Sequence, residues 1–271
     1  MGLGDQAHTP FGEHLSREHR LADADQRMIM VIPTYNEAEN LKGIIARLRS
    51  SVPDSHVLIV DDASPDGSGQ LADEISMSDE HVHVLHRPAK QGLGAAYVAG
   101  FTWCLDRGFD VIGQMDADGS HRPEQLPCLV AALDGADAVL GSRWVPGGEV
   151  VNWPIARKFL SRGGNTYARL AMGIPVRDAT GGFRVFRRHV LASVGLDDVA
   201  SRGYCFQVDV IQRVLDTGFR VVEVPITFVE REHGVSKMSQ RIVSEALLRV
   251  TVWGIERRIG RLKQQRPKRT S

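Results

Sequence analysis

The sequence has few cysteines and no excess of charge of either sign. Its 271 residues contain three cysteines, Cys104, Cys128 and Cys205, and their wide spacing excludes a disulfide scaffold and a paired-cysteine zinc site. We therefore expect a reducing compartment. Lysine plus arginine and aspartate plus glutamate each number 33, so the composition gives no indication of a nucleic-acid-binding protein.

Hydrophobic segments long enough for a membrane span or an export signal are also missing. The longest weakly polar stretch, 92–105, is interrupted by glycine and threonine and is shorter than the ~18 apolar residues of a spanning helix. The first residues lack the basic start and apolar segment of a secretory signal, so we expect a cytoplasmic protein. The 42% of hydrophobic and 24% of charged residues are typical of a globular protein with a sizeable core.

Three regions follow one another along the chain. Residues 1–27 mix glycine, histidine and charged residues without apolar periodicity, and we expect a disordered tail there. Over 28–238, short runs that are apolar on both faces alternate with helical stretches, which predicts an α/β fold with a mostly parallel sheet flanked by helices. Residues 239–271 predict an amphipathic helix and a basic tail.

The expected elements can be placed by residue number. The expected strands are 28–33, 56–61, 81–86, 110–116 and 137–142, and the helices between them are 39–49, 69–77, 95–105 and 124–133. Beyond residue 145 we expect a loop at 145–154, helices at 155–172 and 204–215, a short strand after the turn at 178–183, and a strand at 219–230. Pro225 should interrupt this last strand, because proline cannot donate a hydrogen bond to a neighbouring strand.

Polar residues cluster where three of the expected strands end, at 33–37, 61–67 and 116–121. Ligands bind at the carboxyl ends of strands in open α/β sheets, so these segments are candidate binding loops. Each segment alone is also explained by helix capping or a tight turn. Their coincidence on one edge of one sheet favours a binding site.

Asp116 and Asp118 carry the sharpest signal. Alternate residues of an extended strand point to one side, so we expect the two carboxylates about 6–7 Å apart on that side. Such a pair requires a nearby cation, and its hard oxygen ligands suit Mg²⁺ or Mn²⁺. The alternative is a pair of solvated aspartates at a strand end.

The glycine-rich segment 91–97 does not indicate a dinucleotide-binding enzyme. The third glycine of that fingerprint is absent, and the segment follows the third expected strand instead of the first. The sequence also lacks the GxxxxGK[ST] phosphate-binding loop.

Taken together, the motifs resemble those of the family-2 glycosyltransferases with the GT-A fold. PTYNE (33–37), VDDASPDGS (60–68), GLGAA (92–96) and DAD (116–118) occur in that family's order. Four later segments are similar to the polyprenyl-phosphate (dolichol-phosphate) mannose synthases: GSRW (141–144), DATGGFRVF (178–186), SRGYCFQVD (201–209) and FVEREHGVSKM (228–238).

The resemblance implies a donor site for GDP-mannose. Pro33, Tyr35 and Glu37 would hold its guanine and ribose end, and Val60 and Asp62 would complete the base pocket.

The resemblance also implies a catalytic centre. Asp116, Ala117 and Asp118 would contact the diphosphate, the ribose and the Mg²⁺ or Mn²⁺ ion. Arg143, Arg231 and Lys237 would neutralise phosphate charge, as arginine and lysine side chains do elsewhere. For Arg231 and Lys237, the alternative is an exposed basic loop. The catalytic group would then be Asp116, Asp118, Arg231 and Lys237.

The chain departs from the family's pattern in two places. Gly119 and Ser120 follow the DAD motif, where relatives carry a bulky apolar residue and then Gln or Ser, so a metal ligand at position 120 would be a hydroxyl or a water. Asp209 stands where many relatives have glutamate, which puts a catalytic role there in doubt. His121 fits the shell around a ligand and the cap of the next helix equally well.

The implied reaction is attack of a polyprenyl monophosphate oxygen on C1 of mannose, with departure of GDP and inversion at C1. A phosphate monoester is largely anionic at neutral pH, since its second pKa is about 6, so we expect no dedicated general base. Two alternatives stay open, a UDP-glucose-dependent polyprenyl-phosphate glucosyltransferase and a non-catalytic nucleotide-sugar-binding subunit.

The lipid acceptor requires contact with a membrane, and the C-terminal region offers one. An apolar helical face with Trp253, Ile255, Ile259 and Leu262 adjoins a run of basic residues, which predicts an interfacial helix on an anionic membrane surface. The alternative is a solvated basic tail after a core-packed helix. We expect peripheral association with the cytoplasmic face of a membrane, with or without a separate membrane-anchoring protein.

Overall fold

A computed structural model describes residues 26–196, 199, 204–231 and 247–258. The expectation of disorder over 1–27 lies almost wholly outside this part of the chain, as do Lys237 and most of the region 239–271. Among the described residues, no helix combines the length and hydrophobicity that crossing a membrane requires.

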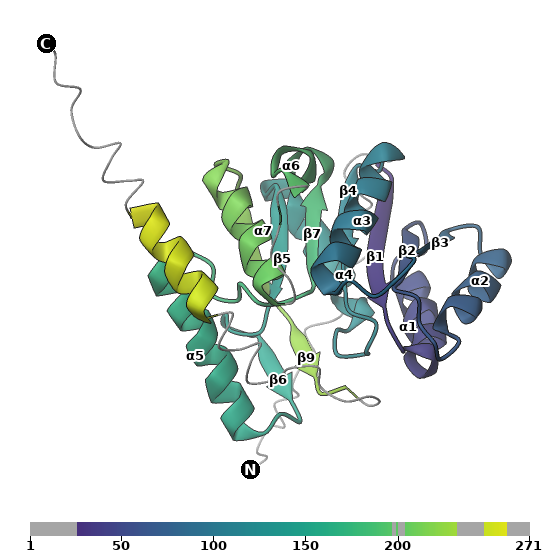
Figure 1. Ribbon diagram of the computed structural model, residues 1–271, viewed down its shortest axis with the longest axis horizontal. Helices are drawn as coiled ribbons and strands as arrows, with labels where there is room; N and C mark the ends of the chain where they lie inside the picture. Colours follow the sequence, from purple (N-terminus) through teal and green to yellow (C-terminus); the bar gives the residue numbers. More distant parts are fainter. Residues whose placement is uncertain (1–25, 197–198, 200–203, 232–246, 259–271) are drawn as a thin grey trace, which may run out of the picture.

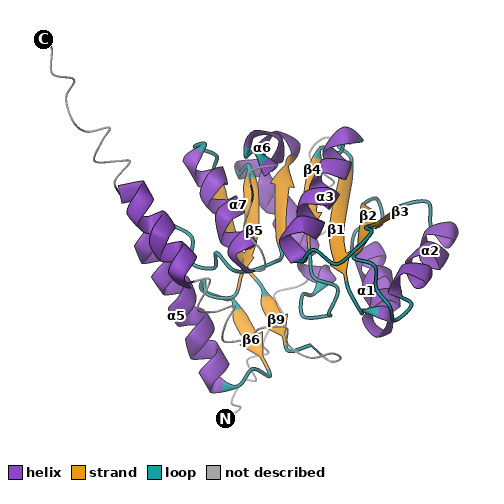
Figure 2. Cartoon of the chain, in the orientation of Figure 1, coloured by secondary structure: helices purple, strands orange, loops and turns teal. Residues whose placement is uncertain are grey.

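Seven strands form one sheet with helices on both faces (Figures 1 and 2). In spatial order they are β3 (Val82–His86), β2 (His56–Asp61), β1 (Met28–Thr34), β4 (Val111–Gln114), β7 (Arg184–Arg187), β5 (Ala138–Ser142) and β8 (Val221–Pro225). Only β7 runs antiparallel to its neighbours in this sheet of described strands. The predicted mostly parallel sheet is therefore confirmed.

Helices occupy most connections between the strands, and one more follows the last strand that the structure describes. They are α1 (Ala38–Ser51), α2 (Ser68–Ser78), α3 (Leu93–Asp106), α4 (Leu126–Ala131), α5 (Ile155–Met172), α6 (Arg188–Ser193), α7 (Tyr204–Asp216) and a helix at 247–258. Two short 3₁₀ segments, Pro123–Gln125 and Ala132–Gly135, flank α4. The helix expected at 124–133 is thus divided, and Pro127, which has no N–H to donate, lies at the start of its α-helical part.

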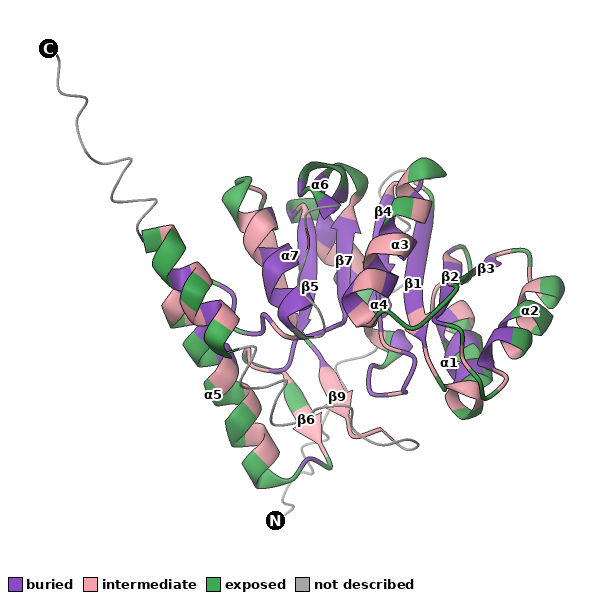
Figure 3. Ribbon diagram, viewed as in Figure 1, coloured by how far each residue is buried: buried purple, intermediate pink, exposed green. Residues whose placement is uncertain are grey.

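Burial explains why the strand sequences are apolar on both faces. Ile29 and Val31 of β1 pack into the core on one side of the sheet, whereas Met28, Met30 and Ile32 pack into the core on the other. Successive side chains of a strand point to opposite faces, so both faces of β1 must be covered. Figure 3 shows this buried sheet between more exposed helices.

Two expected elements differ in the structure. The strand expected at 110–116 ends at Gln114, so the DAD motif lies in the loop that follows β4 and not on an extended strand. The expected loop at 145–154 contains β6 (Glu149–Val151), which pairs in parallel with β9 (Thr227–Val229). Pro225 interrupts the last expected strand as predicted, because β8 pairs with β5 in the large sheet and β9 with β6 in the small one.

The helix at 247–258 lies beside α5 (Figure 1). The hydroxyls of Tyr167 and Thr251 are hydrogen-bonded at 2.6 Å, and a Cβ atom added to Gly254 would lie 2.5 Å from the carbonyl oxygen of Ala171. This close approach fixes the helix pair. Of the predicted membrane-facing residues, Trp253 packs against the core and Ile255 is exposed, while residues 259 and 262 lie outside the described part.

Candidate active site

The loops that follow β1 and β2 are joined by hydrogen bonds. The backbone N–H of Asn36 donates to Ser64 Oγ at 3.2 Å, that of Glu37 to Ser68 Oγ at 2.9 Å, and that of Ala38 to Asp66. These serines and the aspartate satisfy N–H groups that precede and begin α1, which otherwise have no intrahelical acceptor. The segments 33–37 and 61–68 therefore form one connected surface at the carboxyl ends of the two strands.

The residues expected to hold the nucleotide lie on this surface, with one exception. Tyr35 has the Lys90 ammonium 3.6 Å from its ring centroid, and Glu37 accepts a hydrogen bond from Asn40 at 2.9 Å. Pro33 pairs in register with Val60, but the Val60 side chain is fully buried in the core. Only the backbone of Val60 is therefore available at the strand end.

Asp62 is buried and neutralised by a residue that the sequence did not single out. Its carboxylate forms an ion pair with Arg87 and accepts the backbone N–H of Gln91 at 3.3 Å. Arg87 and Lys90 follow β3 in the sequence. Two basic residues just after a third expected strand were therefore the sequence signal that could have predicted their contribution to this surface.

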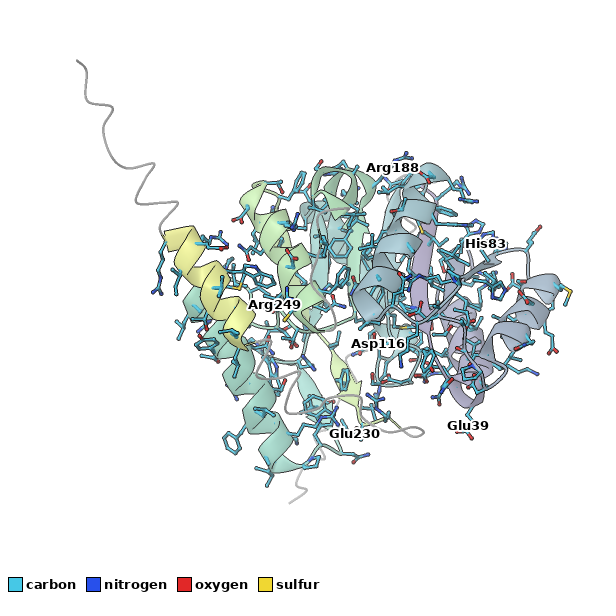
Figure 4. The ribbon with its side chains drawn as sticks, in the orientation of Figure 1. Glu39, His83, Asp116, Arg188, Glu230 and Arg249 are labelled. Atoms are coloured by element: carbon cyan, nitrogen blue, oxygen red, sulfur yellow. The ribbon has the colours of Figure 1, made fainter. Side chains whose placement is uncertain are left out.

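Asp116 lies in the loop after β4, near the middle of the molecule in the view of Figure 4. Tyr97 of α3 donates its hydroxyl to Asp116 Oδ1 at 3.1 Å, and the backbone N–H of Asp116 donates to Nδ1 of the buried His121 at 3.3 Å. Burial raises the pKa of Tyr97 well above its ordinary value, so the phenol stays a donor. Burial lowers the pKa of His121, which keeps the ring neutral.

Asp118 is held by two different donors. Ser120 donates its hydroxyl to Oδ1 at 2.5 Å and its backbone N–H to the same oxygen at 3.1 Å, whereas Arg231 Nη2 lies 3.1 Å from Oδ2. Arg231 follows β9, so the small sheet places it beside a carboxylate that is far away in sequence.

This arrangement suits a divalent cation. Burial raises the pKa of Asp116, and the charge of Asp118 acts in the same direction, whereas Arg231 acts against them. A divalent cation beside the two carboxylates would favour the ionised form of Asp116. Within the described part of the chain, Asp116 Oδ2 accepts no hydrogen bond. The described residues contain no cluster of three or more histidine, cysteine or acidic side chains that could hold a metal. The protein's share of an Mg²⁺ or Mn²⁺ shell would thus be these two carboxylates, with waters and a diphosphate supplying the other oxygens.

A cavity of about 720 Å³ opens beside the two aspartates. Asp116, Asp118 and His121 line one part of it, together with three arginines, Arg143, Arg157 and Arg231. Its other walls are apolar and come from α5, α7 and the helix at 247–258: Phe159, Leu160, Val208, Leu247 and Val250. The predicted nucleotide residues at 33–37 and 60–62 do not line this cavity and lie at the neighbouring strand ends.

Arg143 and Arg157, like Arg231 beside Asp118, are engaged by carboxylates. Arg143 makes a bidentate ion pair with the fully buried Asp178, at 2.8 Å and 2.7 Å, and this contact lowers the pKa of Asp178 against the effect of burial. Arg157 pairs with Glu230 and lies 4.1 Å over the Trp153 ring. A phosphate at Arg143 would therefore meet a guanidinium that Asp178 already partly neutralises.

Asp209 does not line the cavity, although its neighbour Val208 does. It is on α7 and pairs with Arg213 at 2.7 Å, one helical turn along. Tyr97, Trp153 and Arg157 were missed from the sequence, where an isolated aromatic residue or a single arginine in an expected helix gives no specific signal. Lys237, the fourth expected catalytic residue, lies outside the described residues.

Comparison with known proteins identifies the family. The family model for glycosyl transferase family 2 matches residues 29–195. The chain is 54% identical over 238 residues to a polyprenol monophosphomannose synthase of Mycolicibacterium smegmatis, covering 87% of this chain and 90% of the relative. It is 55% identical over 232 residues to an undecaprenyl-phosphate mannosyltransferase of Micrococcus luteus, covering 86% and 96%.

A more distant relative and two solved structures extend the comparison. A dolichol-phosphate mannosyltransferase of Pyrococcus furiosus is 35% identical, with 82% of this chain and 62% of the relative covered. A mannosyltransferase of Pyrobaculum calidifontis, solved with GDP-Man and Mn²⁺, superposes with a TM-score of 0.56 at 17% identity, over 86% of this chain and 64% of the other. A glucosyl-3-phosphoglycerate synthase of Mycobacterium tuberculosis, solved with Mn²⁺, UDP and phosphoglyceric acid, gives 0.61 at 17% identity, over 86% and 79%.

The two superpositions establish the fold, and the sequence matches establish the family. The predicted GT-A fold and the predicted resemblance to the polyprenyl-phosphate mannose synthases are both confirmed. The chain belongs to glycosyl transferase family 2 and is a glycosyltransferase.

Proposed function

We propose that this enzyme transfers mannose from GDP-mannose to a polyprenyl monophosphate, with inversion at C1 and with Mg²⁺ or Mn²⁺ as the cofactor. The observation that carries the proposal is the cavity, which has two carboxylates and arginines in one part and an apolar lining from α5 and the helix at 247–258 in another. A lipid phosphate combines the same two chemistries. The names of the relatives from M. smegmatis and M. luteus support this acceptor class.

In the reaction, an oxygen of the acceptor phosphate forms a bond to C1 of mannose. The bond between C1 and the diphosphate breaks, and its electron pair leaves with GDP. A divalent cation supplies charge stabilisation for the departing diphosphate when it is bound. Asp116 and Asp118 would hold that cation, Arg231 and Lys237 would add positive charge, and the residues at 33–37 and 60–62 would orient the nucleotide.

No dedicated general base is required, because the acceptor phosphate is already anionic at neutral pH. Asp209 pairs with Arg213 and does not line the cavity, which supports this expectation. Arg157 extends the cationic lining toward the apolar wall, where the acceptor's phosphate would lie.

We further propose that the enzyme associates peripherally with the cytoplasmic face of a membrane. Large apolar side chains are exposed on α5, with Ile155 at 72%, Phe159 at 74% and Leu170 at 65%. Leu248 and Ile255 are exposed on the adjoining helix. Exposed apolar side chains on two adjoining helices next to the cavity favour contact with lipid.

The test is a transfer assay with purified protein, a short polyprenyl phosphate and Mn²⁺. Each of GDP-mannose and UDP-glucose is supplied in turn, and lipid-linked sugar is measured with and without EDTA. We expect product from GDP-mannose only, and none with EDTA. Product from UDP-glucose would change the donor but keep the acceptor. Absence of product from both donors would favour a non-catalytic subunit or an obligate membrane partner.

A further inference from the structure

Tyr97 contacts a candidate metal ligand from behind the cavity. Its side chain is fully buried on α3 and does not line the cavity, yet its hydroxyl donates to Asp116 Oδ1 at 3.1 Å. The contact joins residues from two separate elements, since Asp116 follows β4.

The Tyr97 ring is fixed by aromatic neighbours. It stacks on Phe206 of α7 with ring centroids 5.6 Å apart and an interplanar angle of 5°, and it packs on Phe101 at 5.8 Å. Phe101 and Phe206 also pack on each other, with ring centroids 6.4 Å apart. Because the Tyr97 ring is fully buried in this aromatic cluster, the position of the hydroxyl is set by the core and not by the cavity.

The Asp116 carboxylate is confined from a second direction. A Cβ atom added to Gly182 would lie 3.2 Å from Asp116 Oδ2 and 3.3 Å from Oδ1. Gly182 is itself held, because the buried Gln114 side chain donates to its carbonyl oxygen at 3.1 Å. Tyr97 therefore holds one oxygen, and any side chain at position 182 would crowd both oxygens of the carboxylate.

We propose that Tyr97 is the positioning residue for Asp116: its hydroxyl holds Oδ1 so that Oδ2 is presented to the divalent cation. The inference rests on the proposed function, in which Asp116 binds that cation. Hydrogen-bond donors behind a metal ligand typically contribute 10–100-fold to metal affinity, because they fix the ligand's orientation before the metal arrives.

The variant Tyr97→Phe removes the hydroxyl and keeps the stacked ring. We expect Mn²⁺ affinity to fall about 10–100-fold, measured by electron paramagnetic resonance of free Mn²⁺ in titrations of the full-length protein. The Mn²⁺ concentration that half-saturates transfer should rise by a similar factor, and kcat should recover at saturating Mn²⁺. A purely structural defect would lower kcat at every Mn²⁺ concentration.

Phe101→Leu is the matched control. Phe101 belongs to the same aromatic stack on the same helix, and it has no polar atom that could touch a carboxylate. We expect this variant to lower the melting temperature while Mn²⁺ affinity stays at the wild-type value. Equal losses of affinity in Phe101→Leu and Tyr97→Phe would overturn the proposal, since packing alone would then explain the effect.

Asp116→Asn separates this inference from the function on which it rests. If Asp116→Asn abolishes Mn²⁺ binding and Tyr97→Phe leaves it unchanged, only the role of Tyr97 is overturned. If Asp116→Asn itself binds Mn²⁺ like the wild type, the metal role of Asp116 and the Tyr97 inference are overturned together.

Discussion

Two regions of this enzyme are built in opposite ways. The polar side consists of the segments 33–37, 61–68 and 116–121, where side chains satisfy backbone N–H groups and each other. The apolar side consists of α5 and the helix at 247–258, where Ile155, Phe159 and Leu170 are largely exposed to water. Figure 3 shows that much of α5 is exposed or half-buried, whereas the strands of the large sheet are mostly buried.

The difference follows from what each region is proposed to meet. A sugar nucleotide is recognised by hydrogen bonds and charge, which require polar groups held in place before binding. A lipid surface is recognised by apolar area, and the exposed side chains gain free energy only when that surface covers them. If the two regions act independently, a substitution in one region should leave the function of the other unchanged.

The largest effect is expected at the carboxylate pair. Asp116→Asn and Asp118→Asn should each reduce turnover by about 10³-fold or more, because each removes a negative charge that is proposed to hold the cation. Transfer to a short polyprenyl phosphate measures the effect. Asp209→Asn is the matched acid-to-amide control and should retain substantial rate. Collapse of turnover in that variant would show that a base at Asp209 is needed after all.

The next effect is expected on the apolar side. The double variant Ile155→Glu with Leu170→Glu should reduce binding to anionic vesicles on the order of 100-fold, since each Ile or Leu contributes about 1.5–3 kcal/mol when fully covered. Neither residue lines the cavity, so transfer to a detergent-dispersed short acceptor should be unchanged. Vesicle flotation and the transfer assay measure the two effects.

Met77→Glu provides the control for this experiment. Met77 is 80% exposed, but it lies on α2, which belongs to a different part of the molecule. We expect normal vesicle binding from Met77→Glu. Equal losses in this variant and in the α5 double variant would mean that general surface charge, and not the apolar side, controls binding.

A smaller effect is expected where the two apolar helices meet. In Gly254→Val the new Cβ would lie 2.5 Å from the carbonyl oxygen of Ala171, so the helix at 247–258 must move away from α5. Overpacking of this kind costs about 1–3 kcal/mol, and we expect about a tenfold loss of kcat/KM for the lipid acceptor. The Kd for GDP-mannose, measured by calorimetry, should stay the same. A parallel loss of nucleotide affinity would show that the two regions are coupled.

The smallest expected effect is a change of folding stability with pH, caused by His56 in a histidine cluster at the start of β2. Burial, followed by the charges of His83, His81, Arg27 and Arg49, lowers the pKa of His56 to about 4 from its ordinary value of 6.5. The unfolded chain therefore takes up a proton near pH 6.5 that the folded chain takes up only near pH 4. This stability is present above about pH 6.5 and is lost as the pH falls toward 4.

The measurement is the melting temperature between pH 7.5 and 4.5. His56→Gln cannot take up the proton, so it should lose a few degrees less than the wild type over this range. Because His56 is partly exposed, the difference is small. Identical pH profiles for the two proteins would show that His56 does not contribute.

Much of the fold could be predicted because its signals are local. The strands near residues 28, 56, 82 and 138 and the helices between them follow from apolar runs that repeat along the chain. The interruption at Pro225 follows from the missing N–H of a single residue. The β6 and β9 pair could not be predicted in this way, because each strand has three residues and its partner lies far away in sequence.

In the candidate site too, the features carried by neighbouring residues could be predicted, and the contacts between distant residues could not. The sequence placed Asp116 and Asp118 together because they are two residues apart, although it put them on a strand that ends earlier, at Gln114. It assigned Arg143 to phosphate without its partner Asp178, which lies 35 residues further along.

The sequence by itself determined the α/β class, the family and the carboxylate pair, since periodicity and motifs are properties of neighbouring residues. Only the tertiary structure decided that Tyr97 holds Asp116, that Arg231 reaches Asp118, and that α5 leaves apolar side chains in water. The physical reason is that hydrogen bonds, ion pairs and burial act over a few ångströms in space, and the fold sets which distant residues come within that range.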